Sequence, residues 1–223
     1  KNVTSIGEGA FAGCQNMTEI KVSEDNKYFT SENGILYDKK KKVLIQCPEA
    51  KSGEIKIPKS VTDIGGLAFY YCQNLTSIII PENVTNIGRL AFLSCEGLTS
   101  VTIPKGVASI GEDIFEGCTG LTEIKVSENN RYFTSENGVL YDKKKKMLIQ
   151  CPGAKEGEFI IPESVTDIES RAFSHCEKLT SVTIPKGVTQ IEEYTFAWCS
   201  SLSNVSIPKG LTSIGHAAFY SCT

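Results

Sequence analysis

Nine cysteines are the residues of this 223-residue chain best suited to chemistry, and most share one motif. Seven of them end a recurring Phe-x-x-Cys: Cys14, Cys72, Cys95, Cys118, Cys176, Cys199 and Cys222. Disulfides between neighbours in such a column are conceivable, because stacked β-structure places equivalent residues about 4.8 Å apart. Neighbour pairing would leave one member over, and cysteine is among the most often buried residue types. We interpret the column as buried free thiols, with disulfides as the alternative.

Catalytic and metal sites are not indicated by the remaining reactive residues. Zinc is disfavoured because there is no Cys-x-x-Cys pair and only His175 and His216 could assist the thiols. These histidines occupy non-equivalent repeat positions, and no Gly-x-Ser-x-Gly, phosphate-binding loop or metal motif occurs. We therefore expect no enzyme activity, no catalytic residue, no metal and no cofactor.

Two runs of lysine could attract sulfated glycans or other anionic surfaces. Each run follows an aspartate in the segment Tyr-Asp-Lys-Lys-Lys-Lys, and the members are Lys39, Lys40, Lys41, Lys42, Lys143, Lys144, Lys145 and Lys146. The alternative is a solvated hairpin tip whose charges keep strand edges from pairing with other chains. The runs are candidate basic tips on either interpretation.

The composition restricts the class of partner. With 40% hydrophobic and 22% charged residues the chain is typical of a globular protein. A net charge of -3 gives no indication of nucleic-acid binding, which leaves a basic footprint. No apolar run approaches the roughly 20 residues of a membrane helix, so we expect no membrane insertion in this segment.

A 23-residue repeat positions these residues. Ile-Pro recurs with spacings of 23, 23, 58, 23 and 23, and Phe-x-x-Cys keeps the same rhythm. Within each unit, Val-x-Ile before the Pro alternates as a short half-buried strand does, and the Pro ends it. The segment that ends at the repeated Phe and Cys is too short for a regular helix, which predicts about one turn of helix or 3₁₀-helix. One short strand and one turn per 23 residues are typical of a solenoid.

A longer period of 104 residues is superimposed on the repeat. Residues 19–58 and 123–162 differ at only 8 of 40 positions. Each copy contains an Asn-Gly turn and two short apolar runs around the lysines, which predicts a β-hairpin insertion at about 28–48 and 132–152. Each insertion should follow an ordinary strand, around Ile20 and Val22 or around Ile124 and Val126, and a later strand is expected before Pro58 and before Pro162. We predict a single repeat domain over 1–223, with a block at 1–104, its duplicate at 105–208 and the start of a third block at 209–223.

The repeat Leu-Thr-Ser-Val-Thr-Ile-Pro-Lys-Gly-Val, followed by Ile-Gly and Ala-Phe-x-x-Cys, resembles the BspA-type (Treponema pallidum-type) leucine-rich repeat over essentially the whole chain. The resemblance implies a right-handed leucine-rich repeat solenoid with parallel strands on its concave face and the turns on its convex side. It also implies a secreted or cell-surface protein. The chain opens and ends in mid-repeat, so we expect a fragment of a longer protein whose further repeats are partners of this one.

Side chains between the apolar strand residues should face outward on the concave side, where they are the candidate binding residues. They are Glu19, Lys21, Ser77, Ile79, Ser100, Thr102, Glu123, Lys125, Ser181, Thr183, Asn204 and Ser206. The expected function is non-enzymatic binding of a host protein, extracellular matrix or surface glycan. The alternatives are a passive spacer that displays another domain and a glycan-binding accessory module.

Overall fold

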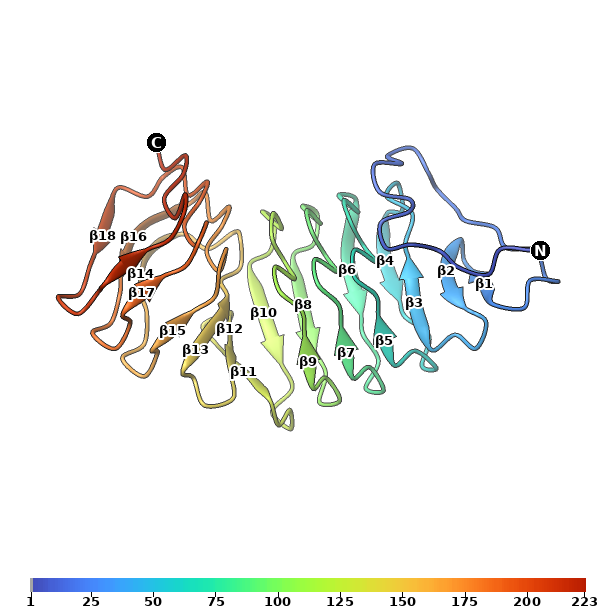
Figure 1. Ribbon diagram of the computed structural model, residues 1–223, viewed down its shortest axis with the longest axis horizontal. Helices are drawn as coiled ribbons and strands as arrows, with labels where there is room; N and C mark the ends of the chain where they lie inside the picture. Colours follow the sequence, from blue (N-terminus) through green and yellow to red (C-terminus); the bar gives the residue numbers. More distant parts are fainter. Residues whose placement is uncertain (1) are drawn as a thin grey trace.

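The computed structural model describes residues 2–223. The chain forms a β-solenoid along which two rows of parallel strands run (Figure 1). The first row consists of β4 (Gly53–Lys56), β6 (Leu75–Ile79), β8 (Ser100–Ile103), β10 (Glu123–Val126), β14 (Gly157–Ile160), β16 (Leu179–Thr183) and β18 (Asn204–Ser206). The second row consists of two-residue strands: β5 (Asp63–Ile64), β7 (Asn86–Ile87), β9 (Ser109–Ile110), β15 (Asp167–Ile168), β17 (Gln190–Ile191) and β19 (Ser213–Ile214). The predicted solenoid of 23-residue coils is confirmed.

The turns that carry the repeated Phe and Cys are not helical, so the prediction of short helical or 3₁₀ turns was wrong. Leu67 and Tyr71 both have left-handed backbone angles, with φ of 56° and 53°. Pairs of left-handed residues four positions apart recur in the equivalent turns, at 90 and 94, 171 and 175, and 194 and 198. A right-handed helix cannot contain such residues.

Backbone hydrogen bonds between coils explain this conformation. The amides of Leu67, Phe69 and Tyr71 donate to the carbonyls of Arg89, Ala91 and Leu93 in the next coil, at 3.1, 2.8 and 2.8 Å. An amide that donates to a neighbouring coil cannot also make the bond to the preceding turn that a helix requires. The turns therefore extend the stacking of the strands around the back of the solenoid.

Each insertion is a three-stranded antiparallel meander rather than the two-stranded hairpin expected. The strands are β1 (Phe29–Glu32), β2 (Ile35–Asp38) and β3 (Val43–Gln46) in the first copy, and β11 (Phe133–Glu136), β12 (Val139–Asp142) and β13 (Met147–Gln150) in the second. The predicted Asn-Gly turns join the first two strands, with positive φ at both residues. The extra strand was missed because Phe-Thr-Ser-Glu has no apolar alternation.

The third strand of each meander belongs to the solenoid. β3 pairs in parallel with β5, and β13 pairs in parallel with β15. β9 ends its sheet and does not pair with β13, so each meander interrupts the second row of strands. The expected strand around Ile20 and Val22 is absent. The amides there donate only to the meander, at Gly34 O and Ser31 Oγ, and no strand precedes them among residues 2–28.

The core is a stack of identical layers. Rings of the repeated Phe stack from coil to coil, with centroids 5.0 Å apart for Phe69 and Phe92 and 4.9 Å apart for Phe173 and Phe196. Both pairs are fully buried. Each such ring contributes roughly 3–5 kcal/mol, judged by the usual cost of its truncation to alanine.

The cysteine column lies beside the rings. All nine cysteines are free thiols, and Cys95, Cys118 and Cys199 are buried. Each of these three donates its S–H to the carbonyl of the repeated Phe one coil earlier, at 3.0–3.1 Å. Burial raises the pKa of the Cys95 thiol well above its ordinary value, which suppresses the reactive thiolate.

Thiol titration tests this arrangement. In the folded protein only Cys14 and Cys222 should react quickly, because these two are partly exposed whereas the other seven are buried. After unfolding without reductant, all nine thiols should be found. A shortfall in the unfolded protein would mean that disulfides link the coils.

Candidate functional site

The outward residues of the first strand row form two parallel lines of side chains. Between β8 and β10, Ser100 lies opposite Glu123 and Thr102 lies opposite Lys125. Between β16 and β18, Ser181 pairs with Asn204 and Thr183 with Ser206 in the same register. We call this surface the long-strand face. Most of the predicted binding residues are therefore aligned on it as expected.

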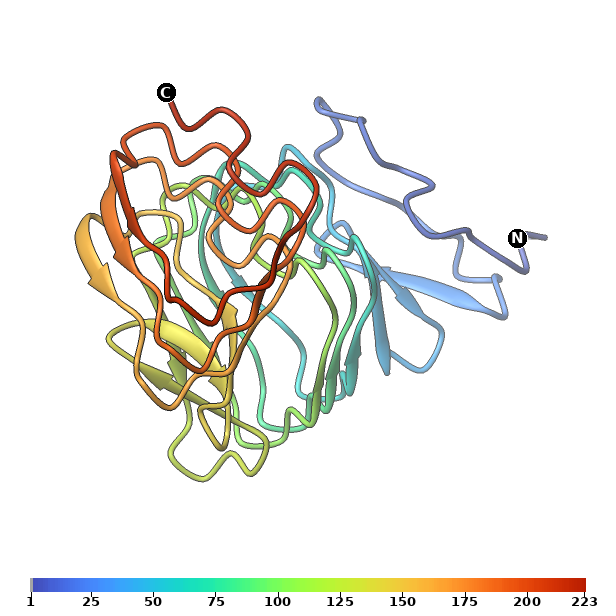
Figure 2. The same cartoon turned by 60° about the vertical axis from the view of Figure 1, so that its left-hand side comes forward.

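The long-strand face is divided into two patches. β4, β6, β8 and β10 carry the first patch, and β14, β16 and β18 carry the second (Figures 1 and 2). The second meander separates them, because the Ile124 amide donates to Gly138 O of the meander at 2.8 Å instead of to a further coil. Glu19 and Lys21 lie apart from both patches, in the irregular segment before the first meander.

The strands expected before Pro58 and Pro162 are present as β4 and β14, but their outward residues were missed as binding candidates. β4 presents Glu54 and Lys56, and β14 presents Glu158 and Ile160, at the same register as Ser77, Ile79, Ser181 and Thr183. The signal that could have identified them is the Ile-Pro dipeptide that ends β6, β8, β16 and β18 and also follows these two strands.

Charged pairs occur on three segments of the long-strand face and its approach. The Lys Nζ to Glu Oε1 distances are 2.6 Å for Lys21 and Glu19, 3.2 Å for Lys56 and Glu54, and 2.5 Å for Lys125 and Glu123. Their side chains are largely solvent-exposed, so each pair contributes little to stability. They can therefore rearrange toward a partner at low cost.

The lysine tips are ordered loops. In the first tip, Asp38 Oδ1 accepts hydrogen bonds from the backbone amides of Lys42 and Val43, at 2.5 and 2.7 Å. Asp142 makes the equivalent bonds in the second tip. Lys41 and Lys145 are ion-paired to Glu32 and Glu136 at 2.5 and 2.6 Å. The positive charge of each tip is thus partly neutralised within its own meander.

Aromatic side chains line the turns of the second block. The rings of His175 and Trp198 stack across two coils with centroids 4.7 Å apart, and the Arg171 guanidinium lies 4.7 Å from the Tyr194 ring centroid. These four residues are only partly buried. Their stacking against one another favours a structural role as a cover over the turns.

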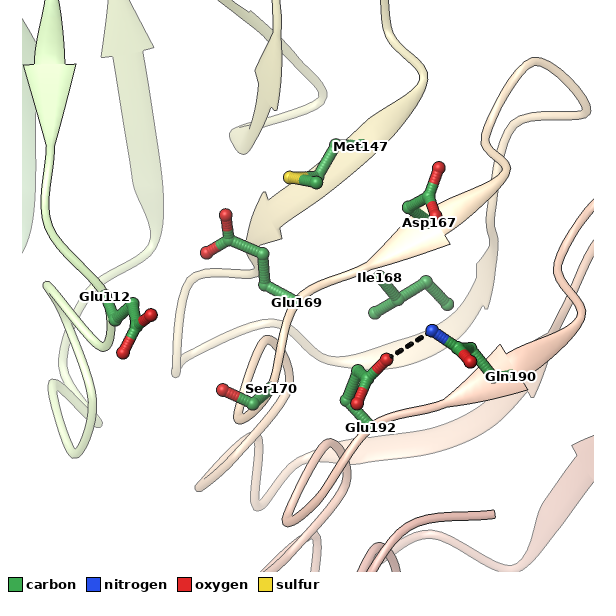
Figure 3. A pocket seen from close by; sticks show the side chains of 8 residues that line it. All are labelled: Glu112, Met147, Asp167, Ile168, Glu169, Ser170, Gln190 and Glu192. Carbon is green, nitrogen blue, oxygen red and sulfur yellow. Dashed lines mark hydrogen bonds between the residues drawn. The ribbon is translucent and has the colours of Figure 1, made fainter. Parts of the chain in front are cut away.

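An acidic cleft lies at the junction where the second meander interrupts the second row of strands, between the coils of β9 and β15, and the sequence did not indicate it (Figure 3). Its volume is about 350 Å³. The residues that line it are Glu112, Met147, Asp167, Ile168, Glu169, Ser170, Gln190 and Glu192. Figure 3 shows the Glu112 and Glu169 side chains approaching from the two sides of the junction, and Gln190 Nε2 donates to Glu192 Oε1 at 2.7 Å.

Burial and like charges make this junction electrostatically unfavourable at neutral pH. Burial, with the neighbouring Glu112 and Asp113 carboxylates, raises the pKa of Glu169 to about 7. Burial also raises the pKa of Asp113, against the lowering effect of Arg171 and Arg89. The two guanidiniums approach Asp113 Oδ2 only to 3.6 and 3.5 Å, and Asp113 Oδ1 is buried without a hydrogen-bond partner.

The chemistry available in the described part of the chain is limited. Residues 2–223 hold no group of three or more His, Cys, Asp and Glu side chains arranged to bind a metal ion. No helix long and apolar enough to cross a membrane is present in the same range. The cleft brings carboxylates together with one hydroxyl, that of Ser170, and its lining residues include no histidine.

Comparison with known proteins identifies the family. Residues 1–37, 41–139 and 152–223 match the BspA type leucine rich repeat region in six copies, and the chain belongs to this family. The comparison with curated proteins gives no match.

Solved structures show the same fold. The pneumococcal vaccine antigen PcpA aligns with a TM-score of 0.73 and 29% identity, over 78% of this chain and 43% of that one. A leucine-rich repeat protein from Eubacterium ventriosum aligns with a TM-score of 0.63 and 33% identity, over 98% and 55%. A leucine rich cell surface protein from Faecalibacterium prausnitzii aligns with a TM-score of 0.63 and 29% identity, over 77% and 52%. The chain thus spans about half the length of these proteins.

The pKa of Glu169 predicts a pH dependence of stability. Between its ordinary pKa of 4.5 and about 7, the folded state retains a proton that the unfolded state releases. The free energy of unfolding should therefore fall as pH rises through this window and level off above it. Replacing Glu169 by Gln should remove about 1 kcal/mol of this fall, after allowance for solvent screening. The measurement is urea unfolding of the parent and Glu169→Gln at several pH values, with Glu54→Gln as an exposed control. If the free energy of unfolding of Glu169→Gln depends on pH as steeply as that of the parent, the prediction is contradicted.

Proposed function

We propose that this chain is a non-enzymatic binding module of a secreted or cell-surface protein, which adheres to a host protein or extracellular matrix through the long-strand face. The observation that carries the proposal is the alignment of exposed Ser, Thr, Asn, Glu and Lys side chains across neighbouring strands. A flat, rigid, hydrogen-bonding surface of this kind suits a protein or glycan partner.

The rigidity of the coils supports this function. Backbone hydrogen bonds hold each strand against its neighbours, so the outward side chains are presented at fixed separations. A partner that contacts several coils meets a preorganised surface and loses little binding energy to ordering. The description of the Faecalibacterium prausnitzii structure as a cell surface protein supports a surface location for a similar domain here.

Binding of the chain to immobilised matrix proteins, host-cell surfaces and sulfated glycans tests the proposal. The parent should bind at least one matrix or host protein, and a variant with Glu54, Lys56, Glu123 and Lys125 changed to Ser should lose that binding. These four residues are exposed on the first patch, so the fold should be retained. A matched control changes Lys40, Lys42, Lys144 and Lys146 to Ser, on the tips.

The outcomes separate the candidate functions. Loss in the face variant alone supports adhesion through the long-strand face. Loss of binding in the tip variant alone, together with binding of sulfated glycans that salt abolishes, would indicate a glycan-binding module in place of an adhesive one. No binding by the parent would favour a passive spacer that displays another domain.

A further inference from the structure

β14 is an edge strand in the middle of the solenoid. The other strands of the second patch follow it in the order β14, β16, β18, and β14 pairs only with β16. In Figure 2 it is the outermost of the three parallel strands, on the left of the molecule. The meander takes the place of a preceding strand beside it, yet β14 packs closely against no strand of that meander. One edge of its backbone is therefore left without a strand partner.

The equivalent strand of the first block shows how such an edge is protected. β4 is also the end of its sheet, and it carries Glu54 and Lys56 as an exposed ion pair. Charged residues, lysine above all, are a common device against strand addition at an exposed edge. β14 lacks this protection because Ile160 replaces Lys56, one of only 8 differences in 40 positions between the copies.

The replacement leaves two exposed groups without partners. Ile160 is 65% exposed, the highest value among the large apolar residues of 2–223. Glu158, two residues earlier on the same face, is exposed and has no ion-pair partner among the described residues, whereas Glu54 is paired with Lys56. Phe159 between them points into the core. The strand therefore presents a backbone edge, an apolar side chain and a free carboxylate.

We propose that β14 is a β-strand addition site that binds an extended segment of a partner protein. Main-chain hydrogen bonds to the free edge would supply affinity, and alternate side chains of the added strand would supply specificity. The segment that fits carries a basic residue beside Glu158 and an apolar β-branched residue two positions away, beside Ile160. A second copy of β14 does not meet this requirement, because Gly-Glu-Phe-Ile contains no basic residue.

This site does not depend on the adhesive function proposed for the long-strand face. It uses the backbone edge of one strand, and none of the four residues changed in the adhesion experiment lies on β14. Failure of either proposal therefore leaves the other standing.

The probe is a fluorescein-labelled peptide, Thr-Thr-Lys-Thr-Val-Thr-Ser, followed by fluorescence anisotropy. The parent chain should bind it, and Ile160→Lys should weaken binding by about tenfold, equivalent to roughly 1.4 kcal/mol. Lysine already occupies this position in β4, so the variant should fold, and its thermal unfolding checks this. The converse variant, Lys56→Ile, should acquire a second peptide site on β4.

Two peptide controls separate strand addition from side-chain binding. The same peptide with its backbone amides N-methylated should not bind, because it has no donors for a ladder. Replacing its Lys by Glu should weaken binding through repulsion from Glu158. Equal binding of the N-methylated and parent peptides, equal binding by Ile160→Lys and parent, or no binding by the parent would each overturn the proposal. A parent that dimerises where Ile160→Lys stays monomeric would also overturn it, by assigning the edge to a second copy.

Discussion

Hydrogen bonding between coils is the constraint on which the rest of this structure depends. A short coil cannot satisfy its backbone within itself, so its amides donate to neighbouring coils, to the preceding coil at positions such as Gly88 and to the next coil around the turns. The left-handed residues at positions such as Leu67 and Tyr71 follow from this requirement. A non-glycine residue there costs about 1–2 kcal/mol, which the two further bonds to the next coil offset. The Phe rings and buried thiols then fill the space that this backbone spacing leaves.

Much of this fold could be predicted because its determinants are periodic. Ile-Pro marks the end of six of the seven strands in the first row, and Phe-x-x-Cys marks each buried turn, so the coils, the core and the position of the insertions follow from spacing alone. The conformation of the turns could not be predicted, because it is decided by amides of the next coil and not by the local sequence. Strands before Pro58 and Pro162 were expected, but the outward residues of β4 and β14 were overlooked for a related reason. Each lies inside a 58-residue interval, where the pattern alone does not show which run faces outward.

The acidic cleft illustrates a second limit of sequence reasoning. Its residues come from segments that the meander brings together, and Glu112 and Glu169 are 57 positions apart in the chain. The first block has an equivalent cleft of about 190 Å³, where Gly65 and Gly66 occupy the positions of Glu169 and Ser170. The two clefts differ in size and in charge, because the first has Glu8 as its one lining carboxylate whereas the second has Glu112, Asp167, Glu169 and Glu192. Only the spatial neighbours show that Glu169 joins these carboxylates and that its pKa is raised to about 7.

The meanders are the elements that interrupt the otherwise regular stack of coils. Regular coils stack directly on one another, whereas the second meander separates the sheet that ends at β9 from the sheet that this meander begins, and separates β10 from β14. It thereby creates a basic tip, a junction cleft and an unpaired strand edge at one level of the array. Stacking requires the core positions to stay apolar from copy to copy, as Ile55 and Phe159 do, but it places no such demand on the exposed residues at this interruption. Substitutions such as Lys56 to Ile160 can therefore change what the surface recognises without disturbing the coils, and duplication of a block supplies a second surface on which such changes can accumulate.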